Sequence, residues 1–76
     1  MIYVDRPRHY PGKMKKYSHM LADDLCELHA FAGSMGIGKH FFHKDHYDIN
    51  EDQYHTAIIS GAILVSTREL IPLRKK

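Results

Sequence analysis

Three helix-start signals constrain the fold of this chain more than any other feature. A capping box is a pair of polar side chains, three residues apart, that bond to the free N–H groups at the start of a helix. Three pairs have this spacing: Asp24 with Glu27, Asn50 with Gln53, and Ser66 with Glu69. We therefore expect a helix after Asp24, a helix over about 51–60, and after Ser66 one short turn of helix that Pro72 limits.

The first of these helices has an apolar face. Side chains three or four residues apart lie on one side of a helix. The apolar residues with this spacing are Leu21, Leu25, Leu28, Ala32 and Met35. Glycines at positions 33, 36 and 38 follow, and we expect them to end the helix.

Short segments of the β type lie between the helices. Residues 2–4 and 62–65 are apolar, and residues 40–43 form a weaker candidate strand. The continuous run 62–65 is typical of a buried parallel strand. Residues 6–17 contain two prolines and a glycine, so we expect a basic loop there.

The alternation of strands with helices predicts the fold class. A chain of 76 residues is long enough for one domain only. We expect a single α/β domain over residues 1–76, with a short sheet of about three mainly parallel strands, two main helices and a short C-terminal helix. Ligands of such sheets bind beyond the carboxyl ends of the strands. Asp5, residues 43–48 and residues 66–69 would then converge on one edge of the sheet.

Composition excludes several classes of protein. No apolar run approaches the roughly 18 residues of a membrane span. We expect no signal peptide, because residues 1–6 show no apolar segment behind a basic start. The single Cys26 excludes an internal disulfide framework and fits a reducing cytoplasm. The sequence therefore indicates a cytoplasmic protein.

The charges are unevenly distributed, although the net charge is only +2. A stretch without any acid contains five cationic side chains: Arg6, Arg8, Lys13, Lys15 and Lys16. Residues 74–76 form a basic tail. With Tyr3, Tyr10 and Tyr17 nearby, the basic stretch could hold nucleic acid by charge and stacking. The alternative is a loop that is only solvated.

Seven histidines are many for a chain of 76 residues, and three of them lie in one polar segment. This segment, 40–48, contains His40, His43, Asp45, His46 and Asp48. Imidazole and carboxylate are ligands of zinc, manganese and iron. We predict a divalent metal ion, zinc or manganese, bound by Asp5, His43, His46 and Asp48. The alternative is a structural cluster in which the histidine and aspartate side chains bond to the loop backbone.

Three further residues are candidates for binding a ligand. His29 lies at the edge of the apolar face of the first helix, where it either points towards Asp5 or is a satisfied boundary histidine. Ser66 and Arg68 follow the last strand and could offer a helix N-terminus and a guanidinium to a phosphate. The capping box explains Ser66 without a ligand. Asp5 itself is either an acid of the site or a residue that caps a turn.

Four motifs spread over nearly the whole chain carry a resemblance to a known family. They read MIYVD-x-P, E-L-H-x-F-A, H-x-D-H-Y-D and G-A-x-x-V-S-x-R-E-L, and they occupy residues 1–7, 27–32, 43–48 and 61–70. In these motifs the chain resembles a small uncharacterised family of bacteria and their phages, which has no known function. The resemblance implies recurring polar positions at Asp5, His19, His29, His43, Asp45, His46, Asp48, Ser66, Arg68 and Glu69.

Two functional hypotheses from different classes follow. The first is a small metal-dependent phosphoesterase with a pocket for a phosphate-bearing ligand, whose catalytic residues are Asp5, His43, Asp45 and His46. The start and end of the chain are also faintly similar to PIN-like nucleases, but the acidic quartet of those enzymes is missing. The second hypothesis is a phage-encoded binding protein, alone or as a homo-oligomer, that occupies a host protein or nucleic acid without chemistry.

Overall fold

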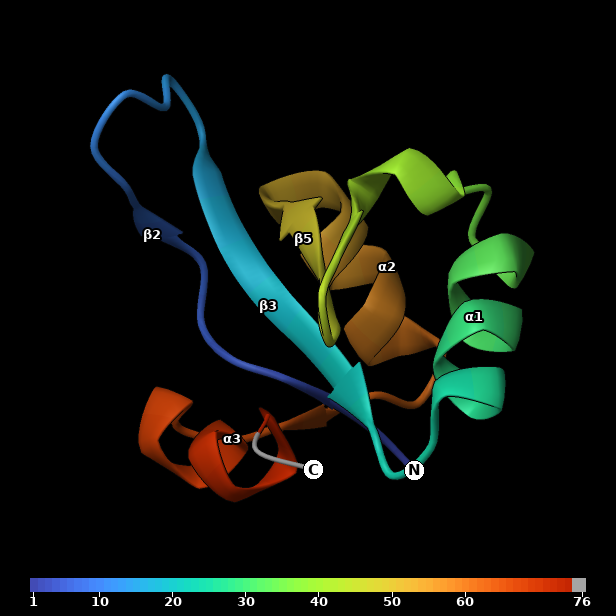
Figure 1. The fold of residues 1–76 in the computed structure, drawn as a ribbon. Coiled ribbons are helices and arrows are strands. Elements are labelled where there is room, and N and C mark those ends of the chain that lie inside the picture. The colour runs from blue at the N-terminus through green and yellow to red at the C-terminus, as the bar shows by residue number, and fades with distance from the viewer. Residues whose placement is uncertain (75–76) are drawn as a thin grey trace.

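The computed structural model describes residues 1–74, with side chains through Leu73 (Figure 1). Lys75 and Lys76 of the basic tail lie outside the described residues. The elements in chain order are β1 (Ile2–Val4), β2 (Arg8–His9), β3 (Lys16–Ala22), α1 (Leu25–Ser34), the 3₁₀ helix η1 (Lys39–Phe41), β4 (Phe42–His43), β5 (His46–Asn50), α2 (Glu51–Ile59), β6 (Ile63–Leu64) and α3 (Thr67–Arg74).

The described strands form one six-stranded mixed sheet. Its order is β4-β5-β3-β1-β6, and β2 pairs with the start of β3. Only the pairing of β1 with β6 is parallel, whereas β3 pairs antiparallel with β1, β2 and β5, and β4 pairs antiparallel with β5. The expected α/β class is confirmed, but the expected short and mainly parallel sheet is wrong.

The error comes from two strands that the sequence pattern hides. β3 begins with the polar residues Lys16, Ser18 and His19 before the buried Met20, and its Leu21 has the spacing of the helix that follows. β5 begins inside the polar segment 40–48, where we predicted metal ligands, and it ends at Asn50, which caps α2. Without these two central strands, the remaining apolar segments look like parallel strands joined by helices.

Other local expectations also need correction. The expected loop 6–17 contains β2 and the first residues of β3. The expected strand 40–43 is mostly the 3₁₀ helix η1, followed by the two residues of β4. Strand β6 is parallel to β1, as expected, but it lies at the edge of the sheet, where Leu64 is 40% exposed. The expected short turn after Ser66 is the longer helix α3, which includes Pro72.

Helices α1 and α2 cover one face of the sheet, and α3 packs on the other face (Figure 1). The main core joins Val4, Met20 and Ile49 of the sheet to Leu28 of α1 and Ala57 of α2. The predicted apolar face of the first helix is only partly confirmed. Leu28 and Ala32 are buried, but Leu25 is 51% exposed and Leu21 belongs to β3. Leu21 is nevertheless almost fully buried, because it faces the side of the sheet that carries α3.

The helix starts agree with the three capping signals. Asp24 accepts from the backbone N–H of Glu27 at 2.8 Å, and Asn50 and Gln53 form both bonds of a capping box at 2.8 Å. Gly36 follows α1 with a φ of 76°, a left-handed conformation that favours glycine. Among the described residues, no helix is both long and apolar enough to span a bilayer.

Candidate functional site

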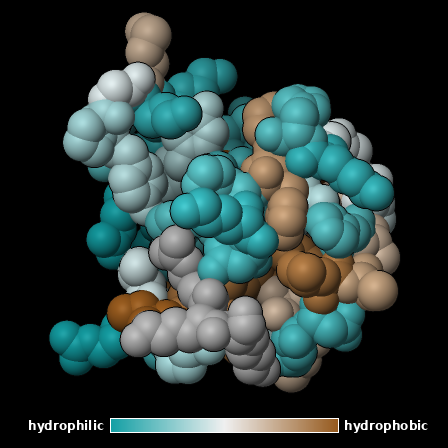
Figure 2. Space-filling model, viewed as in Figure 1, coloured by the Kyte–Doolittle hydropathy of each residue, from teal (hydrophilic) through white to brown (hydrophobic). Residues whose placement is uncertain are grey.

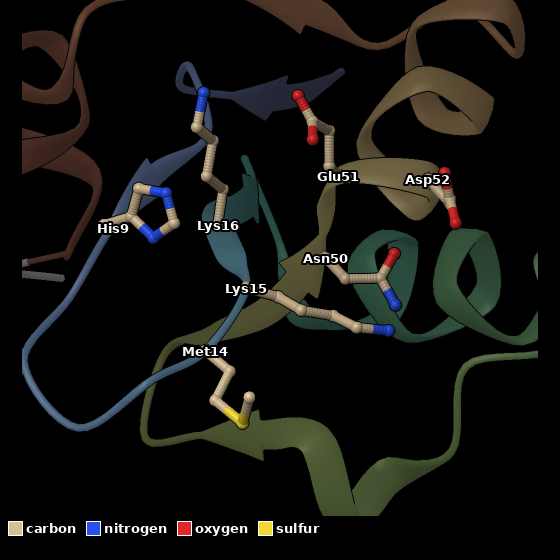
Figure 3. A pocket seen from close by; sticks show the side chains of 7 residues that line it. All are labelled: His9, Met14, Lys15, Lys16, Asn50, Glu51 and Asp52. Carbon is tan, nitrogen blue, oxygen red and sulfur yellow. The ribbon is translucent and has the colours of Figure 1, made fainter.

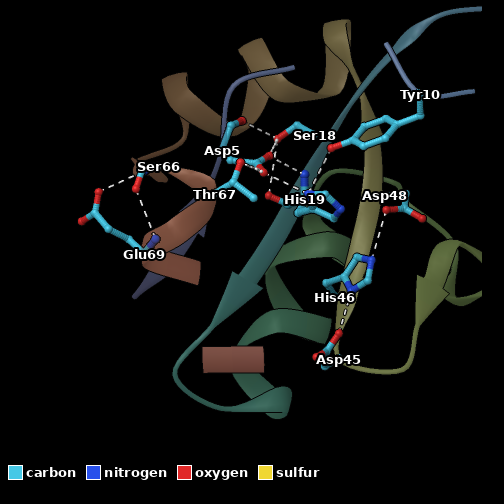
Figure 4. A network of polar contacts seen from close by, with 10 residues as sticks. All are labelled: Asp5, Tyr10, Ser18, His19, Asp45, His46, Asp48, Ser66, Thr67 and Glu69. Atoms are coloured by element: carbon cyan, nitrogen blue, oxygen red, sulfur yellow. Dashed lines mark hydrogen bonds and ion pairs between the residues drawn. The ribbon is translucent and has the colours of Figure 1, made fainter. Parts of the chain in front are cut away.

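Asp5 anchors a polar network at the end of β1 (Figure 4). Its side chain is only 1% exposed. Oδ1 accepts the backbone N–H of His19 at 2.7 Å, and Oδ2 lies 2.9 Å from both the Thr67 hydroxyl and Nδ1 of His19. The hydroxyl of Ser18 donates to the Asp5 carbonyl oxygen at 2.6 Å. Asp5 therefore ties β1, β3 and α3 together at one point.

The ionised carboxylate of Asp5 determines the tautomer of His19. Burial alone would raise the pKa of Asp5, but hydrogen bonds from the side chain and backbone of His19 and from Thr67 outweigh it. The pKa of Asp5 therefore lies below its ordinary value of 3.8. An ionised carboxylate only accepts hydrogen bonds, so Nδ1 of His19 carries the proton. In a neutral imidazole with this tautomer, the other ring nitrogen, Nε2, offers its lone pair to a ligand.

Strand register brings a second histidine and a carboxylate beside His19. β3 and β5 pair so that His19 lies directly opposite Asp48. Side chains alternate across a sheet, so His46, two residues before Asp48, lies on the same face. One ligand atom from each of the three residues lies within 4.8 Å of the others. Atoms about 2.1 Å from one zinc ion lie up to about 4 Å apart, so small side-chain movements would close a metal site.

His46 is held between two carboxylates. It is buried, its Nδ1 lies 2.6 Å from Oδ1 of Asp45, and its Nε2 lies 3.2 Å from Oδ1 of Asp48. A neutral imidazole has one N–H, so it can donate to only one of the two carboxylates. A second proton on the ring or a cation between Nε2 and Asp48 would each account for this contact.

An open pocket of about 270 Å³ adjoins these three residues. His19, His46 and Asp48 line it together with His43, Tyr10, Lys13 and Tyr17. His43 lies opposite His46 in the β4–β5 pairing, and their ring centroids are 5.7 Å apart. Asp48 has a side-chain exposure of 47%, so solvent reaches the site from the pocket side.

The residues present fit a divalent transition metal. Two imidazoles and one carboxylate form a donor set that suits zinc, manganese or ferrous iron. Histidines that bind a metal commonly donate their other N–H to a carboxylate, and here Asp5 and Asp45 are placed to accept from His19 and His46. Three protein ligands leave coordination positions for water or substrate. The cluster could therefore hold a metal ion and still bind a ligand on it.

The structure brings together some of the candidate residues from the sequence. Of the four predicted metal ligands, His46 and Asp48 belong to the cluster, whereas His43 lines the pocket and Asp5 lies behind His19. Asp45, predicted as catalytic, is placed to orient His46.

The three candidate ligand-binding residues lie outside this pocket. His29 belongs to α1, and its Nδ1 is 2.6 Å from the Tyr47 hydroxyl on the core side of the sheet. Ser66 caps α3 by accepting from the backbone N–H of Glu69 at 3.2 Å. Arg68 is exposed on α3 and is not among the residues that line the pocket.

His19 is the residue that sequence reasoning from spacing missed. It lies 27 positions before His46 in the sequence, and only the register of β3 with β5 brings the two side chains together. The family resemblance did indicate His19, because it is one of the recurring polar positions that the resemblance implies.

Two other hollows contain basic side chains from residues 6–16. The first, of about 320 Å³, is lined by Arg6, Arg8 and residues 64–67 and 69, including Thr67, which bonds to Asp5. The second, of about 340 Å³, lies between β3 and the start of α2 and is drawn in Figure 3. Its lining combines Lys15 and Lys16 with Glu51 and Asp52, so charges of both signs share this hollow.

Comparison with known proteins gives a family. Residues 2–76 match a family described as "Protein of unknown function (DUF4031)". No curated protein and no solved structure matches the chain.

Proposed function

We propose a function for the chain, which belongs to this family of unknown function. It binds one divalent transition metal ion through His19, His46 and Asp48 and hydrolyses a phosphoester there. The observation that carries the proposal is the arrangement of the two histidines. Each has its Nδ1 beside a carboxylate, and the ligand atoms of the three residues lie within 4.8 Å. Oδ1 of Asp48 lies 3.2 Å from Nε2 of His46, so a cation bound there would contact both groups.

The donor set supports zinc or manganese as the first metals to test. Both accept imidazole and carboxylate ligands, and neither requires a thiolate. Ferrous iron uses the same donors, so it belongs in the same titration. The carboxylates of Asp5 and Asp45 would hold the two imidazoles in position and make them better ligands.

The pocket supplies groups for a hydrolytic step. A bound divalent ion would make a coordinated water acidic and offset negative charge on a phosphate. In the step, the water oxygen forms a bond to phosphorus, and the bond from phosphorus to the leaving oxygen breaks. His43 transfers the proton released by the water to the leaving oxygen. Lys13, which lines the pocket, pairs with a phosphate oxygen in place of the Arg68 that the sequence suggested.

Metal titration by isothermal calorimetry tests the metal site directly. We expect the wild-type chain to bind one equivalent of zinc or manganese. A double variant, His19→Ala with His46→Ala, should lose at least about 100-fold in affinity because two of three ligands are gone. Asp48→Asn tests the same site with little risk to folding, since this side chain is 47% exposed.

His55→Ala is the matched control for the metal titration. His55 is exposed on α2, and its ring contacts Tyr54 rather than the cluster. This variant should bind metal like the wild type. Absence of binding in the wild type, or equal binding by Asp48→Asn, would contradict the proposed metal site.

Hydrolysis is tested separately with a chromogenic phosphodiester and phosphomonoester. Activity should require added metal, and His43→Gln should reduce kcat on the order of 100-fold while metal affinity stays unchanged. Activity that survives in a chelator, or full kcat in His43→Gln, would contradict the hydrolytic assignment and leave the metal site standing.

A further inference from the structure

A basic arm stands beside the candidate metal site. We define the arm as residues 6–17, which contain β2, the connecting loop and the first two residues of β3. In Figure 1 the arm runs outward from the body of the sheet at the upper left. Its five cationic side chains are exposed, and the sequence contains no acid between Asp5 and Asp23. The arm therefore presents one sign of charge to solvent.

The charge of the arm is available to a partner. Within residues 1–74, no side-chain carboxylate forms an ion pair with any of the five cations. Lys13 lies over the ring of Tyr17, with its Nζ 5.4 Å from the ring centroid. The same region of the space-filling view is mainly hydrophilic, with an apolar patch only at its outermost point (Figure 2).

The arm places cations on both sides of the Asp5–His19 pair. Lys13 lines the pocket at the metal cluster, together with Tyr10 and Tyr17. On the other side, Arg6 and Arg8 line the 320 Å³ hollow that contains Thr67 and Glu69. The remaining cations, Lys15 and Lys16, line the 340 Å³ hollow together with Glu51 and Asp52 (Figure 3). Arg6, Arg8 and Lys13 are thus the cations of the arm in the two hollows that are linked through Thr67, Asp5 and His19.

The pocket is too small to enclose a whole substrate of moderate size. Its volume of about 270 Å³ is below the range of roughly 300–1,000 Å³ that is usual for pockets of small-molecule ligands. A substrate that reaches the metal cluster would therefore extend over the arm. A polymer with a phosphate at every unit matches cations that are distributed along the arm.

We propose that the substrate is a single-stranded nucleic acid whose phosphates bind Arg6, Arg8 and Lys13 while one phosphodiester reaches the His19, His46 and Asp48 cluster. The inference rests on the proposed function, because hydrolysis of that phosphodiester is the step described above. Tyr10 and Tyr17 favour a single strand over a duplex, since aromatic rings stack on bases whose faces are exposed.

Fluorescence anisotropy tests the binding of nucleic acid without any metal. The probes are labelled single-stranded DNA and RNA of about 12 nucleotides, a length that one small domain covers, and the corresponding duplex. The buffer contains a chelator and about 50 mM salt, where phosphate contacts are strong. We expect both single strands to bind more tightly than the duplex, and the tighter of the two identifies the sugar that the site prefers.

The double variant Arg8→Gln with Lys13→Gln removes two proposed phosphate contacts. We expect its affinity for the single strand to fall on the order of tenfold or more, and the slope of log K against log salt to decrease by about 1.4, at 0.7 per lost contact. Lys39→Gln is the matched control, because Lys39 is an exposed cation on η1 outside the three hollows. This control should bind nucleic acid like the wild type.

Three results would overturn the inference: no binding by the wild type, equal loss of affinity in Lys39→Gln, or a duplex bound as tightly as the single strands. Calorimetry with zinc separates this failure from failure of the proposed function. The arm variant should retain the zinc affinity of the wild type, since neither substituted residue belongs to the metal cluster. Binding of metal without binding of the strand would contradict only the inference. Binding of the strand without binding of metal would contradict the proposed metal site.

Discussion

At the scale of single residues, Asp5 is a buried carboxylate that needs hydrogen-bond donors from its neighbours. It is a buried charge, and burial without partners would cost several kcal/mol. Donors from His19 and Thr67 offset this cost. The same bonds fix the orientation of the imidazole of His19 within the His19, His46 and Asp48 cluster, so Asp5 both stabilises the fold and orients a candidate ligand.

Replacement of Asp5 by Asn should show both roles. Asn has only one acceptor oxygen, so its NH₂ group would face a donor at the position of Oδ1 or Oδ2, and the free energy of unfolding should fall by about 3 kcal/mol. Affinity for zinc should fall about 10- to 100-fold because His19 loses its orienting carboxylate. Urea unfolding and calorimetry measure the two effects. Asp52→Asn, an exposed change in the first turn of α2, should alter stability by less than about 0.5 kcal/mol.

The pH dependence of stability follows from the lowered pKa of Asp5. The folded state favours the ionised carboxylate, so its contribution to stability is fully present above the ordinary pKa of 3.8. The contribution is lost as the pH falls below 3.8 and through the lower pKa of the folded state. Asp5→Asn should therefore flatten the acid side of a plot of unfolding free energy against pH. An unchanged acid side in this variant would contradict the assignment.

At the scale of elements, the junction of β5 with α2 joins the strand that carries His46 and Asp48 to the core. His46 and Asp48 lie on β5, and Asn50 ends the strand and caps α2. The Asn50 side chain accepts the backbone N–H of Gln53, and Gln53 accepts the backbone N–H of Asn50, both at 2.8 Å. The strand can therefore end directly in a helix, with no intervening loop.

Removal of this cap should destabilise the chain without affecting the cluster. We expect Asn50→Ala to lower the free energy of unfolding by about 1 kcal/mol. Asn50→Asp keeps the acceptor and should retain most of the stability. Denaturant unfolding of the two variants measures the difference. Equal losses in both would show that the capping bond contributes nothing at this junction.

At the scale of the whole molecule, the small size of the chain limits its stability. A domain of about this length buries only about 60% of the surface that its unfolded chain exposes. The described residues bury a modest core around Met20 and Leu28. A bound metal would therefore supply a substantial part of the total stability.

Thermal melting should reveal this contribution. At a free metal concentration of 100 times Kd, binding adds about 2.7 kcal/mol, which raises Tm by roughly 10–20 °C in a domain of this size. Asp48→Asn should melt at nearly the same temperature with and without metal. A wild-type Tm that does not respond to zinc, manganese or ferrous iron would show that the cluster adds no metal-linked stability.

Local features of the fold could be predicted from the sequence, because their causes are local. Asp24, Asn50 and Ser66 each bond to a residue three positions away, so spacing alone located the three helix starts. The polar segment 40–48, which contains His46 and Asp48, could be identified from its composition and spacing. Strand β5, which places these two side chains on one face, was not predicted.

Only the tertiary structure decided the order of the sheet and the full membership of the metal cluster. Pairing of β3 with β5 joins residues about 30 positions apart, and no local rule specifies which distant strands pair. This pairing places His19 beside Asp48. Pairing of β1 with β3 places Asp5 behind His19 and outside the cluster, because its carboxylate accepts from donors of β3 and α3. Residue types and local spacing come from the sequence, whereas contacts across the sheet depend on the register of the folded chain.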